Sequence, residues 1–212
     1  MMQTTQLYVI RHGETFWNIA GRIQGTLESG LTDIGIAQAN ALATHLLKHP
    51  FQTIYSSDLS RAYQTAKYIA DPKGLEVVID SGLQERNFGI FQGLTWRELE
   101  AKYPRELQEY RNDPDFLITE GESTRQFYNR CAAIFNDIAL RHLGQKVLIV
   151  THGGVVSNLL RYTLGIPFNV PRRFEVVNTS MNIFMYKENH WMLERWGDIQ
   201  HLQHLQSLDD NI

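Results

Sequence analysis

Short runs of aliphatic and β-branched residues alternate along this chain with longer segments of helical periodicity. Strands are predicted at 7–10, 53–56, 76–79 and 146–150. Between these runs, apolar residues recur at spacings of three and four, which is typical of helices that pack one face against a sheet. This alternation predicts an α/β protein, arranged as a three-layer α/β/α sandwich with a mostly parallel, mixed sheet and a small helical cap.

Three of the expected helices have N-terminal capping signals. Thr32 is expected to cap a helix that extends to about residue 49, and Asp58 to cap a helix with apolar residues at 59, 62, 66 and 69. Ser123 and Gln126 form a capping box at the start of a long helix. A further helix is expected over 155–164.

The middle and the C-terminal part of the chain are less regular. A helical pattern over 95–110 is interrupted at Pro104, which marks this region as the candidate cap. We expect residues 1–212 to form a single domain, with cap elements from about 90–122. Further strands are predicted at 174–178, 182–186 and 190–196, and 187–189 joins the last two as a hairpin. The polar tail after Gly197 is expected to be frayed or loosely docked, with His201 and His204 in solvent.

Composition excludes several classes of function. The 212 residues carry 20 basic and 23 acidic side chains, a net charge of −3, with no block of like charge, which speaks against a nucleic-acid or membrane-surface binder. A single cysteine, Cys131, rules out an intrachain disulfide and fits a reducing compartment. No apolar stretch has the length of a membrane span or signal-peptide core. We therefore expect a cytoplasmic protein.

Two of the predicted strands end in histidine followed by glycine. Residues 7–10 lead into Arg11, His12 and Gly13, and residues 146–150 lead into Thr151, His152, Gly153 and Gly154. Ligands of open α/β sheets bind beyond the carboxyl ends of the strands. Because Gly153 and Gly154 lead into a predicted helix, whose N-terminus attracts anions, the pattern indicates a phosphate pocket.

The nearby arginines help to separate two kinds of chemistry. His12, His152 and a carboxylate could form a metal-binding triad. Arg11 lies at the end of an apolar strand, and Arg61 lies on the helix after residues 53–56. Two guanidinium groups would repel a divalent cation but bind a phosphoryl group through paired hydrogen bonds. We therefore expect no metal and no other cofactor.

The ordered motifs of the chain resemble the histidine phosphatase superfamily, the phosphoglycerate mutase-like fold, and its broad-specificity phosphatase branch. The matching residues are Arg11-His12-Gly13-Glu14-Thr15, Trp17-Asn18, Gln24-Gly25, Leu31-Thr32, Gln38-Ala39, Ser56 to Ala62 with Thr65, Leu83-Gln84-Glu85, Gly89, Gln92-Gly93, Gly121-Glu122-Ser123 and Thr151-His152-Gly153. The tripeptide at 11–13 is weak evidence alone, but the ordered set is highly specific.

The resemblance implies roles for some of the matched positions. His12 is the nucleophile that becomes phosphorylated, Glu85 is the proton donor, and Arg11, Arg61 and His152 bind the phosphoryl group. The resemblance also places Asn18, Gln24 and Gly25 near the substrate, and Gly153 belongs to the expected anion site. A neutral imidazole attacks phosphorus, and the arginines offset the charge on the phosphoryl oxygens.

The same site would serve a phosphatase or a mutase. The stretch between Glu85 and His152 leaves little room for a long closed lid, which favours hydrolysis, whereas Glu85 to Gly89 with Phe91 to Gly93 looks partly like the mutase version of this loop. A noncatalytic sensor of phosphate ligands is disfavoured because the nucleophile, the acid and the arginines are all present. We expect a small phosphorylated metabolite as substrate, with homodimer formation left open.

Selectivity beyond the phosphoryl group is expected from the cap and from nearby loops. Arg172, Arg173 and side chains over 91–116 are candidates to contact the rest of the substrate. Aromatic residues that are candidates to line an apolar pocket are Phe16, Trp17, Phe88, Phe91 and Trp96.

Overall fold

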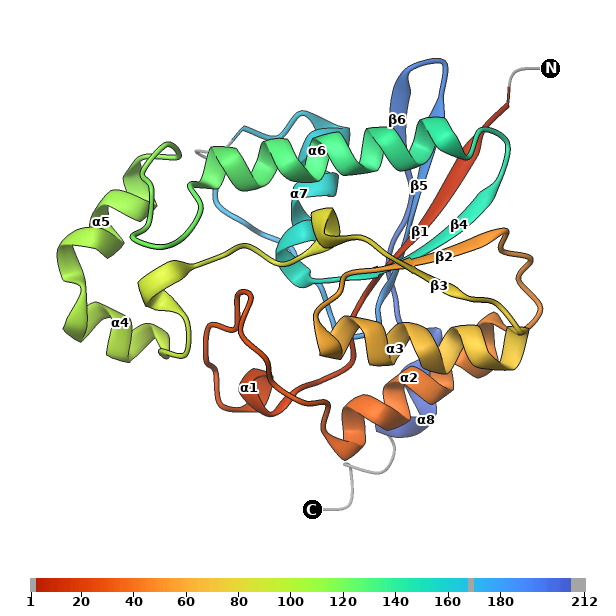
Figure 1. The fold of residues 1–212 in the computed structure, drawn as a ribbon, viewed down its shortest axis with the longest axis horizontal. Helices are drawn as coiled ribbons and strands as arrows, with labels where there is room; N and C mark the ends of the chain where they lie inside the picture. Colours follow the sequence, from red (N-terminus) through yellow and green to blue (C-terminus); the bar gives the residue numbers. More distant parts are fainter. Residues whose placement is uncertain (1–2, 168–169, 207–212) are drawn as a thin grey trace.

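The computed structural model describes residues 3–167 and 170–206. Strands and helices alternate over most of this length, and a β-hairpin follows (Figure 1). The strands are β1 (Thr5–Arg11), β2 (Thr53–Ser56), β3 (Val77–Ile79), β4 (Lys146–Thr151), β5 (Met181–Lys187) and β6 (His190–Asp198). The α-helices are α1 (Phe16–Ile19), α2 (Asp33–Leu46), α3 (Ser60–Ala70), α4 (Trp96–Lys102), α5 (Pro104–Asn112), α6 (Thr124–Arg141), α7 (Gly153–Leu164) and α8 (Gln203–Gln206). Short 3-10 helices lie at Asp71–Lys73, Ser81–Leu83, Gly89–Phe91 and Gln200–Leu202.

The strands form one sheet in the order β3-β2-β4-β1-β5-β6. The first four run parallel to one another, whereas β5 runs antiparallel to both of its neighbours, β1 and β6. This confirms the mixed, mostly parallel sheet. β1 and β4 are far apart in the chain but adjacent in the sheet, and their register pairs Arg11 with Thr151. The next residue of each strand is a histidine, so His12 and His152 leave the sheet next to each other.

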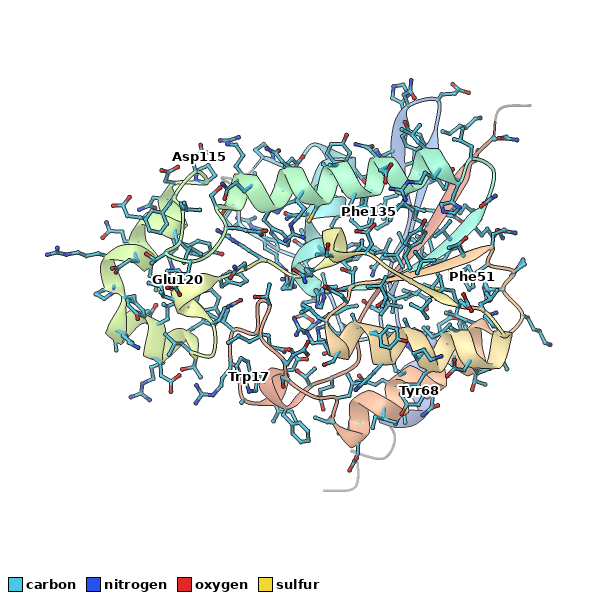
Figure 2. The ribbon with its side chains drawn as sticks, in the orientation of Figure 1. Trp17, Phe51, Tyr68, Asp115, Glu120 and Phe135 are labelled. Atoms are coloured by element: carbon cyan, nitrogen blue, oxygen red, sulfur yellow. The ribbon has the colours of Figure 1, made fainter. Side chains whose placement is uncertain are left out.

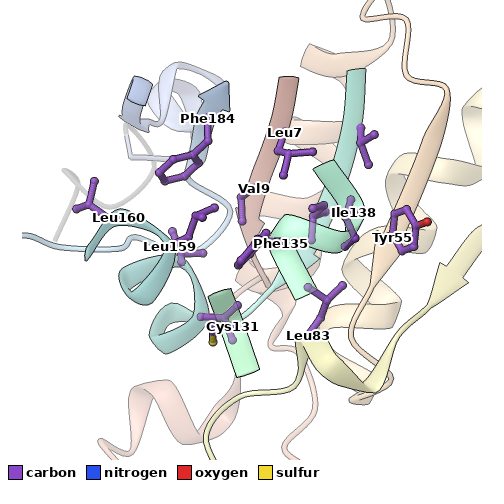
Figure 3. Close-up of a cluster of buried hydrophobic side chains, with 14 of the residues drawn as sticks. Leu7, Val9, Tyr55, Leu83, Cys131, Phe135, Ile138, Leu159, Leu160 and Phe184 are labelled. Carbon is purple, nitrogen blue, oxygen red and sulfur yellow. The ribbon is translucent and has the colours of Figure 1, made fainter. Parts of the chain in front are cut away.

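A pair of helices covers each face of the sheet, α6 and α7 on one and α2 and α3 on the other, which confirms the three-layer architecture (Figure 1). β1 shows the alternation that produces this packing: Leu7 and Val9 contact the first pair of helices, and Tyr8 and Ile10 the second. Phe135 of α6 is fully buried in the first cluster (Figure 3) and lies between its helix and the sheet (Figure 2). Burying a side chain of this size stabilises the fold by about 1.5–3 kcal/mol.

A third, smaller apolar cluster lies at the end of the molecule where α4 and α5 extend away from the sheet (Figure 1). We call residues 90–122 the cap. Phe91, Leu99 and Leu107 form the buried centre of this cluster, to which the segment after α1 contributes Ile23. Pro104 begins α5 and so separates it from α4, as the sequence predicts.

The strand predicted at Phe174–Asn178 is wrong. Both edges of β1, the strand that this segment contacts, are already paired with β4 and β5, so the segment cannot extend the sheet at that strand. Its backbone instead bonds the end of β1, because Val176 O accepts from the side chain of Arg11 and the amide of Thr179 donates to Arg11 O. The ring of Phe174 packs edge-on against Trp196, with ring centroids 5.3 Å apart.

Two predicted helix boundaries also differ. Thr32 caps α2 as expected, but the helix ends at Leu46, because the following residues form tighter bonds that reach back three positions. Asp58 is not the cap of α3. Leu59 holds that position with no side-chain hydrogen bond, and the Asp58 carboxylate instead accepts from Gln84 Nε2.

The tail after Gly197 packs more closely than expected. Residues 200–206 form short helical turns, and His201 and Leu202 are buried. The solvated position predicted for His201 is wrong, because its Nε2 lies 3.1 Å from Thr179 Oγ1 and its ring faces His45 of α2. The side chain of His204 and residues 207–212 lie outside the described residues.

Candidate active site

His12 and His152 lie at the carboxyl ends of the two central strands, as the sequence predicts. The amide of His12 donates to Thr151 O at 2.9 Å, which extends the β1–β4 pairing by one residue. The two imidazoles meet edge to face, with ring centroids 5.2 Å apart. Both are buried, with exposures of 3% and 0%.

The imidazole of His12 is held in a single tautomer. Its Nδ1 lies 2.7 Å from Gly13 O, and because a carbonyl oxygen only accepts, Nδ1 carries the proton and Nε2 keeps a free lone pair. Burial, and then the charges of Arg11 and Arg61, hold the pKa of His12 well below its usual 6.5. The low pKa favours the neutral imidazole, with the lone pair on Nε2.

His152 is also neutral and is positioned by a different contact. Its Nε2 lies 2.9 Å from Ser57 Oγ, at the end of β2, whereas its Nδ1 is buried and has no partner among the described residues. Burial lowers the pKa of His152 most, followed by the charges of Arg61 and His12. An unpartnered polar atom in such a place indicates a site built for a ligand.

Arg11 and Arg61 place two guanidinium groups beside the histidines. Arg61 is 1% exposed and donates to Leu27 O and Gly25 O, while Arg11 donates to Val176 O. The Nε of each is buried and has no partner within the described residues. Burial lowers the pKa of Arg11 to about 10, and the carboxylate of Glu85 opposes this shift.

The carboxylate of Glu85 faces the same pocket from a loop after the Ser81–Leu83 helix. Its Oε1 accepts from its neighbour's amide, Arg86 N, and its Oε2 accepts from Gly154 N, both at 2.9 Å. Gly154 is the second residue of α7, whose N-terminal dipole favours a negative group. The helix that follows His152 therefore also orients Glu85.

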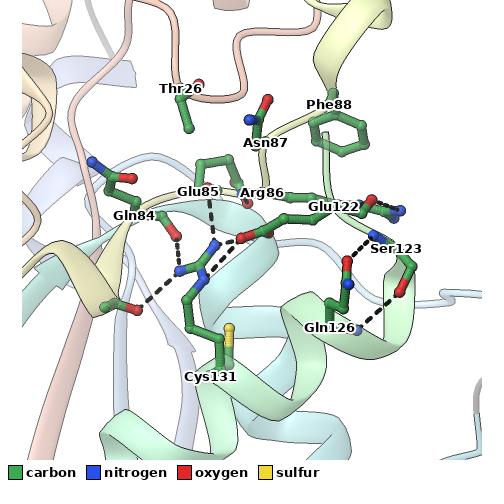
Figure 4. Close-up of polar contacts among 12 residues, drawn as sticks. Thr26, Gln84, Glu85, Arg86, Asn87, Phe88, Glu122, Ser123, Gln126 and Cys131 are labelled. Atoms are coloured by element: carbon green, nitrogen blue, oxygen red, sulfur yellow. Dashed lines mark hydrogen bonds and ion pairs between the residues drawn. The ribbon is translucent and has the colours of Figure 1, made fainter. Parts of the chain in front are cut away.

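Two arginines fix the backbone around Glu85 (Figure 4). Arg130 of α6 donates to the carbonyl oxygens of residues 82, 84 and 85 and forms an ion pair with Glu122 at 3.0 Å. Arg86 donates to Glu122 O and to Thr124 Oγ1. Glu122 thus links the end of the cap to the loop that carries the carboxylate.

The remaining predicted positions also lie in this region. Asn18 accepts through Oδ1 from Thr15 and Asn178, which leaves its amide nitrogen as a donor. Gln24 donates to Thr15 Oγ1 and has a buried Oε1 with no partner among the described residues. Gly25 has a φ of +54°, and a Cβ there would overlap the side chain of Gln92. Gly153 begins α7 beside Arg11.

These residues line a pocket of about 530 Å³. Every predicted site residue contributes to its wall except His152, which lies fully buried behind it. Of the aromatic candidates, Trp17, Phe88 and Trp96 line the pocket, whereas Phe91 belongs to the core of the cap. Phe16 is not among the lining residues and is exposed at the surface.

Sequence reasoning missed several residues of this site. Ser57 stood within a matched motif but was given no role, although it contacts His152. Arg86 and Arg130 looked like ordinary charged residues, because their partners are mostly backbone carbonyls that no pattern reveals. Asn178 lies in the segment mistaken for a strand, and its side chain donates to His12 O.

Other groups considered from the sequence are not part of this pocket. No cluster of three or more His, Cys, Asp or Glu side chains is placed to hold a metal ion in the described ranges. Cys131 is buried in the apolar core beside α7, and burial raises the pKa of its thiol to about 12. None of the described helices is long and apolar enough to cross a membrane.

The arrangement is suited to phosphoryl transfer. It combines a neutral imidazole with a free lone pair, two guanidinium groups with unpartnered N–H donors, and a carboxyl group on the same pocket. Such positioned charges stabilise the oxygens of a phosphoryl group during in-line displacement.

Comparisons with known proteins agree with this geometry. A model of the histidine phosphatase superfamily (branch 1) matches residues 7–199. The chain is 38% identical over 204 residues to phosphoglycerate mutase-like protein 4 of Arabidopsis thaliana, covering 93% of this chain and 87% of that protein. It is 37% identical over 208 residues to a metal-independent phosphoserine phosphatase of the same plant, covering 94% and 84%. Among solved structures, a phosphoserine phosphatase variant from Entamoeba histolytica in complex with phosphoserine superposes with a TM-score of 0.84 at 30% identity, covering 93% and 99%.

Proposed function

Because the chain belongs to the histidine phosphatase superfamily, we propose that it hydrolyses a small phosphorylated metabolite through a phosphohistidine at His12. The lone pair of Nε2 attacks phosphorus, an N–P bond forms, and the bond from phosphorus to the leaving oxygen breaks. Glu85 gives that oxygen a proton. Water then attacks the phosphohistidine, loses a proton to Glu85 and releases inorganic phosphate with the imidazole restored.

The observation that carries the proposal is the tautomer of His12 beside unpartnered arginine donors. Because Nδ1 donates to Gly13 O, the lone pair is on the nitrogen that can face a phosphorus atom. The free Nε groups of Arg11 and Arg61 supply N–H donors for the phosphoryl oxygens, and His152 with its unpartnered Nδ1 lies behind them. Asn18, Gln24, Gly25 and Gly153 would complete the contacts to the substrate.

Water is the proposed acceptor of the phosphoryl group. The cap has two short helices, and Trp96 and Tyr110 line only part of the pocket, which supports access for water. The similarity to a phosphoserine phosphatase supports the same choice. Phosphoglycerate mutase activity is the second candidate, favoured by the similarity to a phosphoglycerate mutase-like protein.

A labelling experiment tests the proposal. The protein is mixed with a ³²P-labelled phosphomonoester, quenched in alkali, where phosphohistidine survives, and digested to locate the label. We expect label on His12 and none in His12→Ala, which should lose activity by on the order of 10⁴-fold or more. His190→Ala, an exposed histidine at the start of β6, is the control. Label elsewhere, or full activity of His12→Ala, would refute the proposed nucleophile.

A second assay, with 3-phosphoglycerate as substrate, distinguishes water from a second phosphoglycerate as the acceptor of the phosphoryl group. Release of inorganic phosphate from 3-phosphoglycerate without formation of 2-phosphoglycerate identifies a phosphatase. Rapid interconversion of the two phosphoglycerates, dependent on traces of the bisphosphate, would identify a mutase.

We further propose that residues 1–212 act as one domain whose cap contributes to substrate selection. Cap residues line the same pocket as His12, which supports this view. We also propose a cytoplasmic location and no nucleic-acid or membrane partner. The single cysteine supports the location, and the balanced charge supports the lack of such partners. Size-exclusion chromatography with light scattering would decide whether the protein forms a homodimer.

A further inference from the structure

The charged side chains that line the active-site pocket are mostly positive. Glu85 is its one lining carboxylate in the described chain, and five arginines accompany it: Arg11, Arg22, Arg61, Arg86 and Arg172. Within the described residues, only Arg22 of these five forms an ion pair, with Glu98 of the cap at 2.9 Å. The other four guanidinium groups form no ion pair in the described chain, and Glu85 is the one carboxylate that lines the pocket with them.

The four unpaired guanidinium groups are held by neutral oxygens. Arg11 and Arg61 donate to carbonyls, as described above, and Arg86 donates to Glu122 O and Thr124 Oγ1. Arg172 donates through Nε to Phe174 O at 2.8 Å. Carbonyl and hydroxyl oxygens orient a cation without neutralising its charge, so this pocket keeps its positive potential for a ligand.

A single phosphoryl group does not balance this charge. On the proposed function, the phosphoryl dianion lies against Arg11 and Arg61, with Glu85 nearby. Arg172 then still faces the pocket with no ion pair in the described chain, whereas the charges of Glu122 and Glu85 act on Arg86. Concentrating like charges in this way is unfavourable unless a ligand offsets them.

Of these two arginines, Arg172 is better placed to contact a ligand. Arg86 is 3% exposed, and its three nitrogens all donate within the protein. Arg172 is exposed, and neither of its terminal nitrogens bonds to another described residue. Its Nε bond and the ring of Phe174, 5.7 Å from its guanidinium carbon, hold it at the pocket wall.

We infer that the natural substrate carries a second anionic group besides the phosphoryl group that is transferred, and that Arg172 binds it, with Arg86 adding positive potential behind. This inference rests on the proposed phosphatase function and deepens it. The charge of Arg172 also acts on Arg11, whose pKa it lowers, so an anion at Arg172 relieves repulsion between the two. Arg172 is then a specificity-determining residue.

Pairs of substrates that differ in the second anion test the inference. 3-Phosphoglycerate has a carboxylate where glycerol 3-phosphate has a hydroxymethyl group, and fructose 1,6-bisphosphate has a second phosphate that fructose 6-phosphate lacks. We expect the wild-type protein to favour the doubly anionic member of at least one pair by about tenfold or more in kcat/KM, the scale of one charged hydrogen-bonded contact. The pair that shows the preference identifies the anion as carboxylate or phosphate.

Two adjacent arginines provide a matched comparison. Arg172→Gln should reduce the preference by about tenfold, mainly through KM, and Arg173→Gln should leave it unchanged, because Arg173 is exposed but does not line the pocket. Equal kcat/KM values within both pairs, or a preference that survives Arg172→Gln, would overturn the inference.

Hydrolysis of p-nitrophenyl phosphate keeps the two proposals separate. Its absence in the wild type refutes the phosphatase, whereas hydrolysis of this ester combined with equal rates within both substrate pairs refutes only the second anion.

Discussion

Replacing Gly154 with alanine should displace the carboxyl group of Glu85 without harming the fold. Gly154 is the second residue of α7, where an alanine backbone is unstrained and gains up to about 1 kcal/mol in helix propensity. A Cβ at this position, however, would overlap Glu85 Oε1 and lie 3.0 Å from its Cδ. The end of a glutamate side chain is flexible, so it moves instead of the helix.

The size of the effect follows from these contacts. Non-bonded carbon atoms prefer separations of about 3.5–4.0 Å, so the carboxyl group must retreat by about 0.5–1 Å. It then loses or weakens the 2.9 Å hydrogen bond from Gly154 N, a contact to a charged group worth about 1.5–3 kcal/mol. A misplacement of about 1 Å costs on the order of 100-fold in rate. Both routes give a loss of about 10- to 100-fold in proton donation.

The assay measures kcat/KM against the pKa of the leaving alcohol. Nitrophenyl phosphates need little protonation, whereas alkyl phosphates need a full proton, so Gly154→Ala should lose activity selectively on the alkyl esters. Gly153→Ala is the matched control, because the nearest atoms to its Cβ would belong to the Arg11 side chain, at ordinary distances of 3.5 to 3.8 Å. Its leaving-group dependence should parallel that of the wild type. An equal loss of activity on both ester classes in Gly154→Ala would refute the reasoning.

Three other outcomes are expected. Glu85→Gln should lower kcat/KM for alkyl phosphates by about 10²- to 10⁴-fold but affect nitrophenyl phosphates far less, and a uniform loss would deny Glu85 the role of acid. EDTA should not reduce turnover, because the arginines take the role of a metal, and strong inhibition that added metal reverses would contradict this. Burial lowers the pKa of His12 below 6.5, so the unfolded chain binds a proton there that the folded chain does not, and the free energy of unfolding should fall as the pH drops below about 6.5. In urea titrations at pH 7 and 5, His12→Gln should show a smaller fall than the wild type.

Local sequence determined most of the secondary structure and the identity of the reacting groups. Helix caps at Thr32, Thr95 and Ser123 depend on contacts within three residues, so the chain encodes them directly, and the capping box predicted at Ser123 is confirmed. Placing His12 and His152 at strand ends also needed only the apolar runs before them.

Tertiary structure decided which of these groups meet. Nothing in the local pattern makes β4 the neighbour of β1, yet that pairing and its register bring the two histidines together. The same holds for His201, which looked solvated in a polar tail but is buried against α2. It also holds for residues 174–178, which look like a strand but lie against β1, whose two edges are already paired. Periodicity reports which face of an element is apolar, whereas neighbours, unpartnered donors and uncompensated charges depend on contacts between residues far apart in the chain.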